Sequence, residues 1–296
     1  MNYTELLQYL ITGITIGSVY AMVAAGFNII YNVTEVINFA QGEFVMLGGL
    51  VAVFFQVKLG LHPVLTFAAT LAVVCLVGIL LDRLAIKPIK NPSVLTLIIA
   101  TIACSMLIKG VAMAIWGKDP YALPGFSSSN SIEVLGAVIH PQALWSIVLL
   151  IIIVIVFTFF FEKTLLGKAM KACADNAEAA SLVGINPKRL ILISFALSAA
   201  IGALAGIGVT PMALMEYDRG AMLAVKGFAA LILGGLGSFP GAILGGLILG
   251  VIESLGAGYI SSGYKDAFAL IVLLLLLFAR PSGLLGNATV SKLKKF

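Results

Sequence analysis

Residues 142–161 read QALWSIVLLIIIVIVFTFFF, a run of twenty residues without a charged side chain. About 20 apolar residues in a helix are long enough to cross the roughly 30 Å hydrocarbon core of a bilayer. Similar runs recur along the chain, which is 61% hydrophobic and only 10% charged over its 296 residues. Soluble domains carry about 25% charged residues. The sequence therefore predicts a helical protein that crosses a membrane several times.

Four other runs reach a similar length, and four more are shorter or less regular. The long runs are 6–31, 63–85, 94–116 and 190–210, and the others are 43–57, 223–236, 241–258 and 267–279. The two glycine-rich runs on either side of Gly237 resemble the interrupted short helices that line transport pathways. We expect an all-α polytopic membrane protein of about nine transmembrane or re-entrant helices, within a range of eight to ten. We expect one transmembrane domain over residues 1–296.

The basic residues predict the orientation, since Lys and Arg collect in short cytoplasmic loops. With nine helices, the 86–93 loop, the 162–190 loop and the C-terminal tail fall on one side. That side holds 12 of the 18 Lys and Arg residues, namely Arg83, Lys87, Lys90, Lys163, Lys168, Lys171, Lys188, Arg189, Arg280, Lys292, Lys294 and Lys295. We therefore expect the C-terminus in the cytoplasm, and the N-terminus and the 117–141 loop outside.

Glycines at four-residue spacing predict where helices pack closely. Lipid tails are as apolar as the helices, so helix association depends on small residues that let backbones touch. The pairs with this spacing are Gly13–Gly17, Gly202–Gly206, Gly241–Gly245 and Gly246–Gly250. We also expect the stretches 32–42 and 234–245, which each break an apolar run, to be corresponding parts of two structural repeats.

The sequence lacks the motifs of an enzyme. It contains no G-x-x-x-x-G-K-[ST] phosphate loop, no G-x-S-x-G elbow and no H-E-x-x-H zinc motif. His62 and His140 each precede a proline in an expected external loop, and none of the three cysteines forms a C-x-x-C. We therefore expect no catalytic residue, no bound metal and no cofactor on this chain.

Polar side chains in or beside the apolar runs are the candidates for a translocation pathway. A charge at the bilayer centre costs about 2.5–3.5 kcal/mol on insertion scales, so it needs a partner or water. Glu253 lies within a glycine-rich run, where pairing inside the bundle and lining of a pathway both remain open. Asn38, Gln41 and Glu43 flank the start of another run. Two interpretations of these three residues remain open: a re-entrant turn near the pathway, or an ordinary inner loop.

The expected cytoplasmic loop 162–190 contains a segment of small residues. Lys168 to Leu182 is rich in alanine and favours a helix. Gly184 fits a C-terminal cap, and Pro187 follows as a stop. A short helix held between two spans can dock into a groove on a cytosolic protein, or it can be a solvated connection.

Within this loop, Glu178-Ala179-Ala180-x-x-x-Gly184 resembles the E-A-A-x-x-x-G core of the coupling loop in permeases of ABC importers. Three more stretches resemble branched-chain amino acid permeases: VINFAQGE at 36–43, GGLGSFPGA at 234–242 and RPSGLLG at 280–286. The length and the short N-terminal segment are similar to the smaller of the two permeases in the high-affinity system. The general motif continues to a distal Ile-x-Leu-Pro, and this chain has no such Leu-Pro after Gly184.

The resemblance implies the translocation subunit of an ATP-driven importer in the bacterial inner membrane, with branched-chain amino acids as substrate. It implies a second homologous permease, two cytosolic ATPase subunits that bind ATP and magnesium, and an external substrate-binding protein. Glu178, Ala179, Ala180 and Gly184 are then expected to contact the ATPases. Import of an amide, urea or another amino acid is an alternative. An ion-coupled secondary transporter would need several deep acidic residues, and Glu253 is the one candidate.

Overall fold

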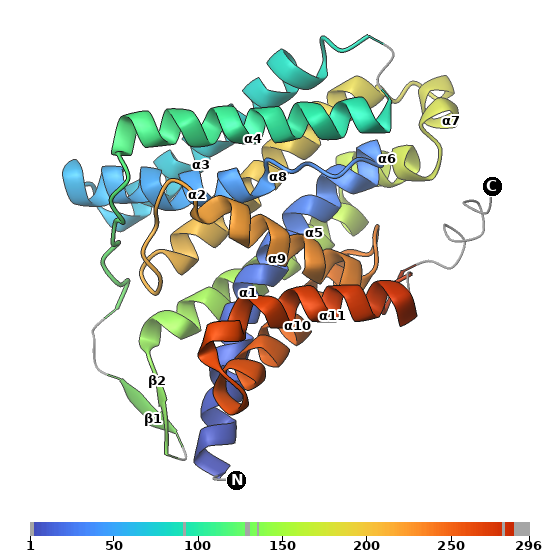
Figure 1. The fold of residues 1–296 in the computed structure, drawn as a ribbon. Coiled ribbons are helices and arrows are strands. Elements are labelled where there is room, and N and C mark those ends of the chain that lie inside the picture. The colour runs from blue at the N-terminus through green and yellow to red at the C-terminus, as the bar shows by residue number, and fades with distance from the viewer. Residues whose placement is uncertain (1–2, 91–92, 128–130, 135, 280–281, 287–296) are drawn as a thin grey trace.

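The computed structural model describes residues 3–90, 93–127, 131–134, 136–279 and 282–286, most of them in helices (Figure 1). The helices are α1 (Tyr3–Thr34), α2 (Gln41–Val53), α3 (Pro63–Leu81), α4 (Val94–Trp116), α5 (Pro141–Lys163), α6 (Leu165–Asp175), α7 (Ala177–Leu182), α8 (Pro187–Val209), α9 (Arg219–Gly234), α10 (Phe239–Tyr259) and α11 (Lys265–Ala279). Two π-helical turns, η1 (Phe54–Lys58) and η2 (Asp82–Ile86), extend α2 and α3, and a short 3-10 turn, η3 (Ser262–Tyr264), precedes α11.

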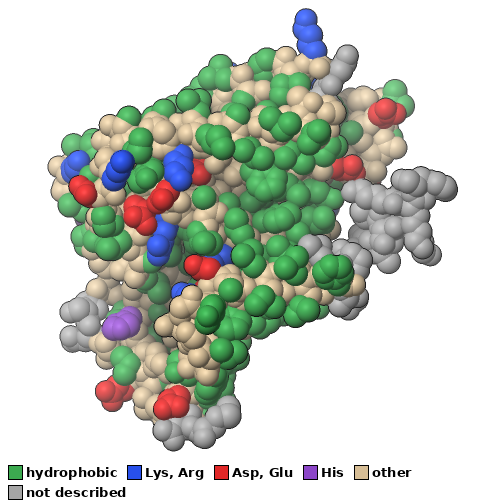
Figure 2. Space-filling view, in the orientation of Figure 1, with side chains coloured by type: hydrophobic (Ala, Val, Ile, Leu, Met, Phe, Trp, Pro, Cys, Tyr) green, Lys and Arg blue, Asp and Glu red, His purple; other side chains and the backbone are tan. Residues whose placement is uncertain are grey.

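Six helices of the described chain are long and apolar enough to cross a membrane: α1, α3 with its π-helical extension, α4, α5, α8 and α10. This finding confirms the predicted class, a helical polytopic membrane protein. Helices α2, α9 and α11 have only 13, 16 and 15 residues, which at 1.5 Å per residue is about 20–24 Å. Figure 2 shows hydrophobic side chains over much of one face, with a group of charged side chains at the left of the view and others at the top, right and bottom.

Local sequence signals explain where several helices begin. Proline occupies the first turn of α3, α5, α8 and α10, where its missing N–H and fixed φ suit the helix start. The side chains of Ser93, Thr164, Asn186 and Ser238 accept a backbone N–H from the first turn of α4, α6, α8 and α10. Each cap satisfies a donor that the helix itself leaves unpaired.

The 117–141 segment contains an antiparallel hairpin that the sequence analysis did not predict. Strand β1 (Ile132–Val134) pairs with β2 (Ala137–Ile139). The Gln8 side chain donates to the Val138 carbonyl at 3.0 Å and accepts from the Val138 N–H at 2.8 Å. The first turns of α1 therefore lie on the same side of the bundle as the hairpin, as the expected topology requires.

The order of elements occurs twice, in opposite directions. Both α1–α4 and α8–α11 consist of a long helix, a short helix, a helix that begins with proline and a fourth helix. Helix α1 begins beside the hairpin, whereas α8 begins beside α6 and α7 at the other end. The segments that lead into the short helices are 35–40 and 210–218, so these two correspond. The expected pairing of 32–42 with 234–245 is replaced, because 235–238 is the turn between α9 and α10.

Helices α1 and α10 form the most extensive helix pair in the described chain. A Cβ atom added to Gly13 would lie 2.7 Å from the Cα of Val251 in α10. One added to Gly17 would lie 2.9 Å from the Cα of Leu247, also in α10. Gly246 and Gly250 of α10 face α1 in return. Helices can approach this closely only where neither carries a side chain at the contact.

The other predicted glycine pairs also lie at helix contacts. Gly202 and Gly206 of α8 face α2, and Gly241 and Gly245 of α10 face α9. A Cβ atom on Gly245 would lie 2.7 Å from the backbone nitrogen of Gly234 and would also collide with a carbonyl oxygen one turn earlier in α9. These contacts lie within this chain, so they stabilise its own fold.

Replacing Gly245 by leucine should lower the thermal unfolding midpoint of the purified protein. Overpacking typically costs about 1–3 kcal/mol, and here the colliding atoms are backbone, which no change of rotamer can move away. Gly110→Leu in α4 is the matched control, since an added Cβ there meets no atom within 4 Å. Equal midpoints for the two variants, measured in the same detergent, would contradict the close contact of α9 and α10.

Candidate functional site

Helix α2 begins in the middle of the bundle and not at its surface. Gln41, the first residue of α2, lies beside Ser198, which is halfway along α8. The Gln41 amide donates to the Ser198 carbonyl at 3.3 Å, and the Ser198 hydroxyl hydrogen-bonds with the Gln41 side-chain oxygen and with the Gly26 carbonyl, the latter at 2.8 Å. The segment 35–40 therefore turns back from the end of α1 into the bundle.

Helix α9 begins at the same depth. A Cβ atom on Gly220 would lie 2.6 Å from the Gly42 carbonyl oxygen, and one on Gly42 would collide with the Gly220 carbonyl oxygen. The N-terminal ends of α2 and α9, one from each half of the fold, thus meet inside the bundle. Helix N-termini carry partial positive charge and unpaired N–H groups, so this junction is a polar place in an apolar surrounding.

Several buried polar atoms near this junction have no hydrogen-bond partner among the described residues. They are the Asn38 side-chain nitrogen and one Glu43 carboxylate oxygen, and both polar atoms of Asn28 in α1 are likewise without a partner among the described residues. The other Glu43 oxygen accepts from the Ser105 hydroxyl at 2.9 Å. Buried polar atoms are normally satisfied by protein, water or ligand. Asn38, Gln41 and Glu43, all predicted from the sequence, therefore lie together in a polar layer inside the bundle.

Glu253, the fourth pathway candidate, belongs to a separate cluster of charges. The Lys226 ammonium lies 2.9 Å from a Glu253 oxygen, 2.6 Å from an Asp266 oxygen and 3.0 Å from the Tyr20 hydroxyl. Tyr20 donates to the same Glu253 oxygen at 3.0 Å, and Lys265 approaches it at 3.5 Å. The Lys226 and Glu253 side chains are 6% and 0% exposed. The cluster joins α1, α9, α10 and α11.

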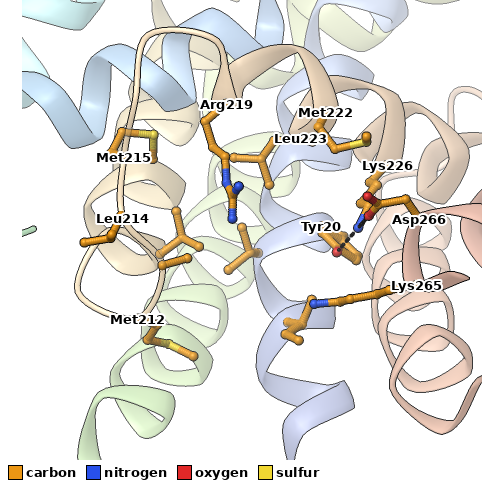
Figure 3. A pocket seen from close by; sticks show the side chains of 14 residues that line it. Tyr20, Met212, Leu214, Met215, Arg219, Met222, Leu223, Lys226, Lys265 and Asp266 are labelled. Atoms are coloured by element: carbon orange, nitrogen blue, oxygen red, sulfur yellow. Dashed lines mark hydrogen bonds and ion pairs between the residues drawn. The ribbon is translucent and has the colours of Figure 1, made fainter. Parts of the chain in front are cut away.

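A cavity of about 380 Å³ opens beside this cluster (Figure 3). The Arg219 and Lys265 side chains extend into it from different walls. Backbone hydrogen bonds in both directions, at 2.8 and 2.9 Å, join Met215 in its wall to Tyr121 in the 117–141 segment. The cavity therefore lies toward the hairpin end of the bundle. Its larger apolar wall residues are Ile16, Met212, Leu214, Met215, Met222 and Leu223.

Sequence reasoning identified Glu253 but missed its partner Lys226. A signal was present, because a lysine inside the apolar run 223–236 needs an acidic partner or water. Tyr20 and Asp266 carried no such signal, since only the packing of α1 and α11 brings them to the cluster. Of the two roles left open for Glu253, the structure shows pairing, with its partner lining a cavity.

At the opposite end of the bundle, the end of α9 and residues 282–286 lie side by side. They belong to two of the stretches that resemble branched-chain amino acid permeases, 234–242 and 280–286. The N–H groups of Leu284 and Leu285 donate to the carbonyls of Leu233 and Gly234, each at 2.9 Å. Residues 282–286 therefore run beside the end of α9. A second cavity of about 480 Å³ lies between this surface and the ends of α1, α5 and α6. Arg280 and the three lysines of the C-terminal tail, which the topology prediction uses, lie outside the described residues.

The 162–190 segment forms two helices, where the sequence predicted one over Lys168 to Leu182. Asn176 adopts an extended conformation (φ −160°, ψ 104°) that ends α6, and its side chain accepts the Ala179 N–H at 2.9 Å to begin α7. Asparagine favours such caps because its short side chain replaces a helical bond. Cys173 of α6 is buried, and burial raises the pKa of its thiol, so it packs as an apolar group.

Gly184 lies two residues after the end of α7, and its φ of +88° is in the left-handed region. The Gly184 N–H bonds to the Ser181 carbonyl and the Ile185 N–H to the Ala180 carbonyl, both at 3.1 Å. This pair of bonds is the Schellman motif, which favours glycine because other residues are strained there. The structure thus provides the sharp turn that the sequence predicted at this position.

The four predicted coupling residues do not share one surface. Glu178, Ala179 and Gly184 are exposed. Ala180 is only 4% exposed and packs in the core of its own chain. Ala180 therefore faces its own chain, and the contact of the four residues with an ATPase stays a prediction. Two apolar side chains that the prediction omitted, Leu182 and Val183, are 88% and 78% exposed.

Comparison with known proteins gives consistent results. The family model "Branched-chain amino acid transport system / permease component" matches residues 9–278. The high-affinity branched-chain amino acid permease BraD of Pseudomonas aeruginosa is 33% identical, with 97% of each chain covered. LivH of Salmonella typhimurium, of the same description, is 34% identical over 98% of this chain and 99% of the relative. The ribose import permease RbsC of Haemophilus influenzae is 27% identical over 88% of this chain and 81% of the relative.

Proposed function

This chain belongs to the family of branched-chain amino acid transport permease components, and from that premise we propose that it forms the translocation path of an ATP-driven importer for branched-chain amino acids. Relatives described as permeases for these amino acids match nearly the whole chain at 33–34% identity. The relative described as a ribose permease matches at 27%. Amino acids are thus better supported than sugars as the substrate class.

The observation that carries the proposal is the place of α6 and α7. They pack against the ends of α1, α5 and α8, where a push from a cytosolic subunit would reach three long helices. The sequence holds no phosphate-binding loop of the Walker type, so the energy of ATP hydrolysis has to come from another subunit. A partner that binds one conformation more tightly shifts the spans between their states.

We assign the ATPase contact to the exposed surface of α7. Glu178, Ala179 and Gly184 lie on it, and Leu182 and Val183 add apolar area that a groove on the partner would bury. The assembly then contains two ATPase subunits with their ATP and magnesium, a second homologous permease and an external binding protein. Co-purification from native membrane tests this composition, and a chain that purifies alone, without ATPase subunits, would contradict it.

The translocation path in this proposal passes the polar layer at the junction of α2 and α9. Asn38, Gln41 and Glu43 lie there, and unpaired polar atoms in this layer offer hydrogen bonds to water or solute. An ion-coupled transporter is less well supported, because Glu253 is already paired with Lys226. The direct test is uptake of labelled leucine by proteoliposomes that hold the assembled complex. ATP-independent uptake, or no uptake of any branched-chain amino acid, would refute the function.

We further propose nine membrane elements, with α2 and α9 as half-length helices, the N-terminus and hairpin outside and the C-terminus inside. A single cysteine at Ser127 should then react with an impermeant thiol reagent added outside intact cells, and one at Lys188 should react only after permeabilisation. Both side chains are exposed, so a difference in labelling between the two sites would not come from burial of one of them. The native cysteines Cys75, Cys104 and Cys173 are replaced first. Reaction of both sites from outside would overturn the topology.

A further inference from the structure

The cavity beside Lys226 combines an apolar wall with side chains of both charges (Figure 3). We propose that it is a binding site for a free α-amino acid with an apolar side chain, within the membrane subunit itself. The inference rests on the proposed import of branched-chain amino acids and adds a site where this chain recognises that substrate. The volume of about 380 Å³ lies in the lower part of the range of small-ligand pockets, about 300–1,000 Å³.

Arg219 and Lys265 are the groups that bind the substrate carboxylate. Lys226 is already held by Glu253 and Asp266 at 2.9 and 2.6 Å. Arg219 pairs with Glu216 at 3.8 Å, and both side chains are partly exposed, so this pair is weak. The Arg219 guanidinium extends into the open cavity, and its planar fork matches the two oxygens of a carboxylate.

Three cations and one carboxylate line the cavity. Arg219, Lys226 and Lys265 line the cavity together with Asp266, and Glu253 lies behind Lys226. Glu216 is the third carboxylate beside these cations, but it lies 3.8 Å from Arg219 in a partly exposed pair, so the carboxylate of a bound amino acid can displace it. Asp266 is 55% exposed and has capacity for a second bond, so it accepts the ammonium group of the ligand.

Methionine and leucine side chains, together with Ile16, Val19 and Val209, form the apolar part of the wall. Met212, Leu214 and Met222 are 41%, 52% and 44% exposed, although they line a cavity that also contains charges. An aliphatic ligand side chain would remove this apolar surface from water. Methionine is flexible and polarizable, so a wall of this kind adapts to several aliphatic shapes. The site therefore accepts leucine, isoleucine and valine, and disfavours a charged side chain.

The cavity lies where a substrate that enters from the proposed outer side would reach it before the polar layer. Its wall is bonded to the 117–141 segment through Met215 and Tyr121, toward the proposed outer side. Arg219 is followed by Gly220, which touches Gly42 at the polar junction of α2 and α9. The first turn of α9 thus borders both the cavity and the polar layer, and a bound substrate would contact that helix.

Binding of tritiated leucine to the full-length chain in nanodiscs, without binding protein or ATPases, tests the site. We expect saturable binding that isoleucine and valine displace. Leucinamide and 4-methylpentanoate should compete at least ~10-fold less well, because each lacks one charge of the zwitterion. Glutamate should not compete. This competition experiment uses the wild-type chain, so its result does not depend on whether a variant folds. Absence of saturable binding, or equal competition by leucinamide, would overturn the inference.

Two variants and a control locate the site. Arg219→Gln and Lys265→Gln should each weaken leucine binding ~10-fold or more, while Lys118→Gln, an exposed lysine away from the cavity, should not. Unchanged binding in both cavity variants, or a lower unfolding midpoint with unchanged binding, would show that these charges only hold the helices together. If the wild-type importer takes up leucine while the isolated chain does not bind it, the inference fails and the proposed function stands. If no branched-chain amino acid is taken up, the proposed function fails.

Discussion

Replacing Gly184 by valine should abolish substrate uptake by the assembled importer, while the chain stays folded in the membrane and the external binding protein still binds substrate. Gly184 has a φ of +88° and ends α7 through the Schellman bonds. A β-branched residue is strained in this conformation by about 1–3 kcal/mol, so the end of α7 would rearrange. The exposed Leu182 and Val183 would then no longer present the surface that fits the ATPase.

The measurements are uptake and the stimulation of ATP hydrolysis by loaded binding protein. Gly184→Asn should keep most of both, since asparagine tolerates the left-handed region better than other residues. Gly60→Val is the matched control, because Gly60 also has a positive φ, of 65°, with no atom within 4 Å of an added Cβ, and it lies at the other end of the bundle. Full uptake and full stimulation in Gly184→Val would refute the role of α7 in coupling.

Replacing Lys226 by methionine should destabilise the protein more than any substitution of an exposed lysine. The change leaves the Glu253 carboxylate buried, 0% exposed, with only the Tyr20 hydroxyl and the more distant Lys265 nearby among the described residues. Breaking a buried ion pair by removing one partner costs about 3–5 kcal/mol, since an uncompensated charge remains. A clear fall of the thermal unfolding midpoint in detergent measures it.

The double variant Lys226→Met, Glu253→Gln separates charge from packing. It removes both charges, so most of the lost stability should return. Lys58→Met is the exposed control: Lys58 lies over the Tyr121 ring at 5.8 Å, a contact worth about 0.5–1 kcal/mol at such a site. A double variant no more stable than Lys226→Met would show that the loss comes from packing and not from the ion pair.

The sequence by itself determined the class of the protein and the positions of its helices along the chain. Each predicted apolar run corresponds to one helix, including the short runs that became α2, α9 and α11. This worked because a helix in lipid satisfies its backbone hydrogen bonds internally and needs a length that matches the bilayer. Both requirements act within one segment. The break at Asn176 was missed because the alanine-rich residues on both sides favour a single helix.

Only the tertiary structure decided which polar residues meet. Glu253 was visible as a charge in an apolar run, but its link to Tyr20, 233 residues away in the chain, depends on how α1 and α10 face one another. Hydrophobic periodicity does not reveal that face, because in lipid the outer side of a helix is as apolar as the inner side. Ala180 was missed for a different reason: a stretch of small residues has no periodicity that shows which face is buried, and α7 turns Ala180 toward its own chain.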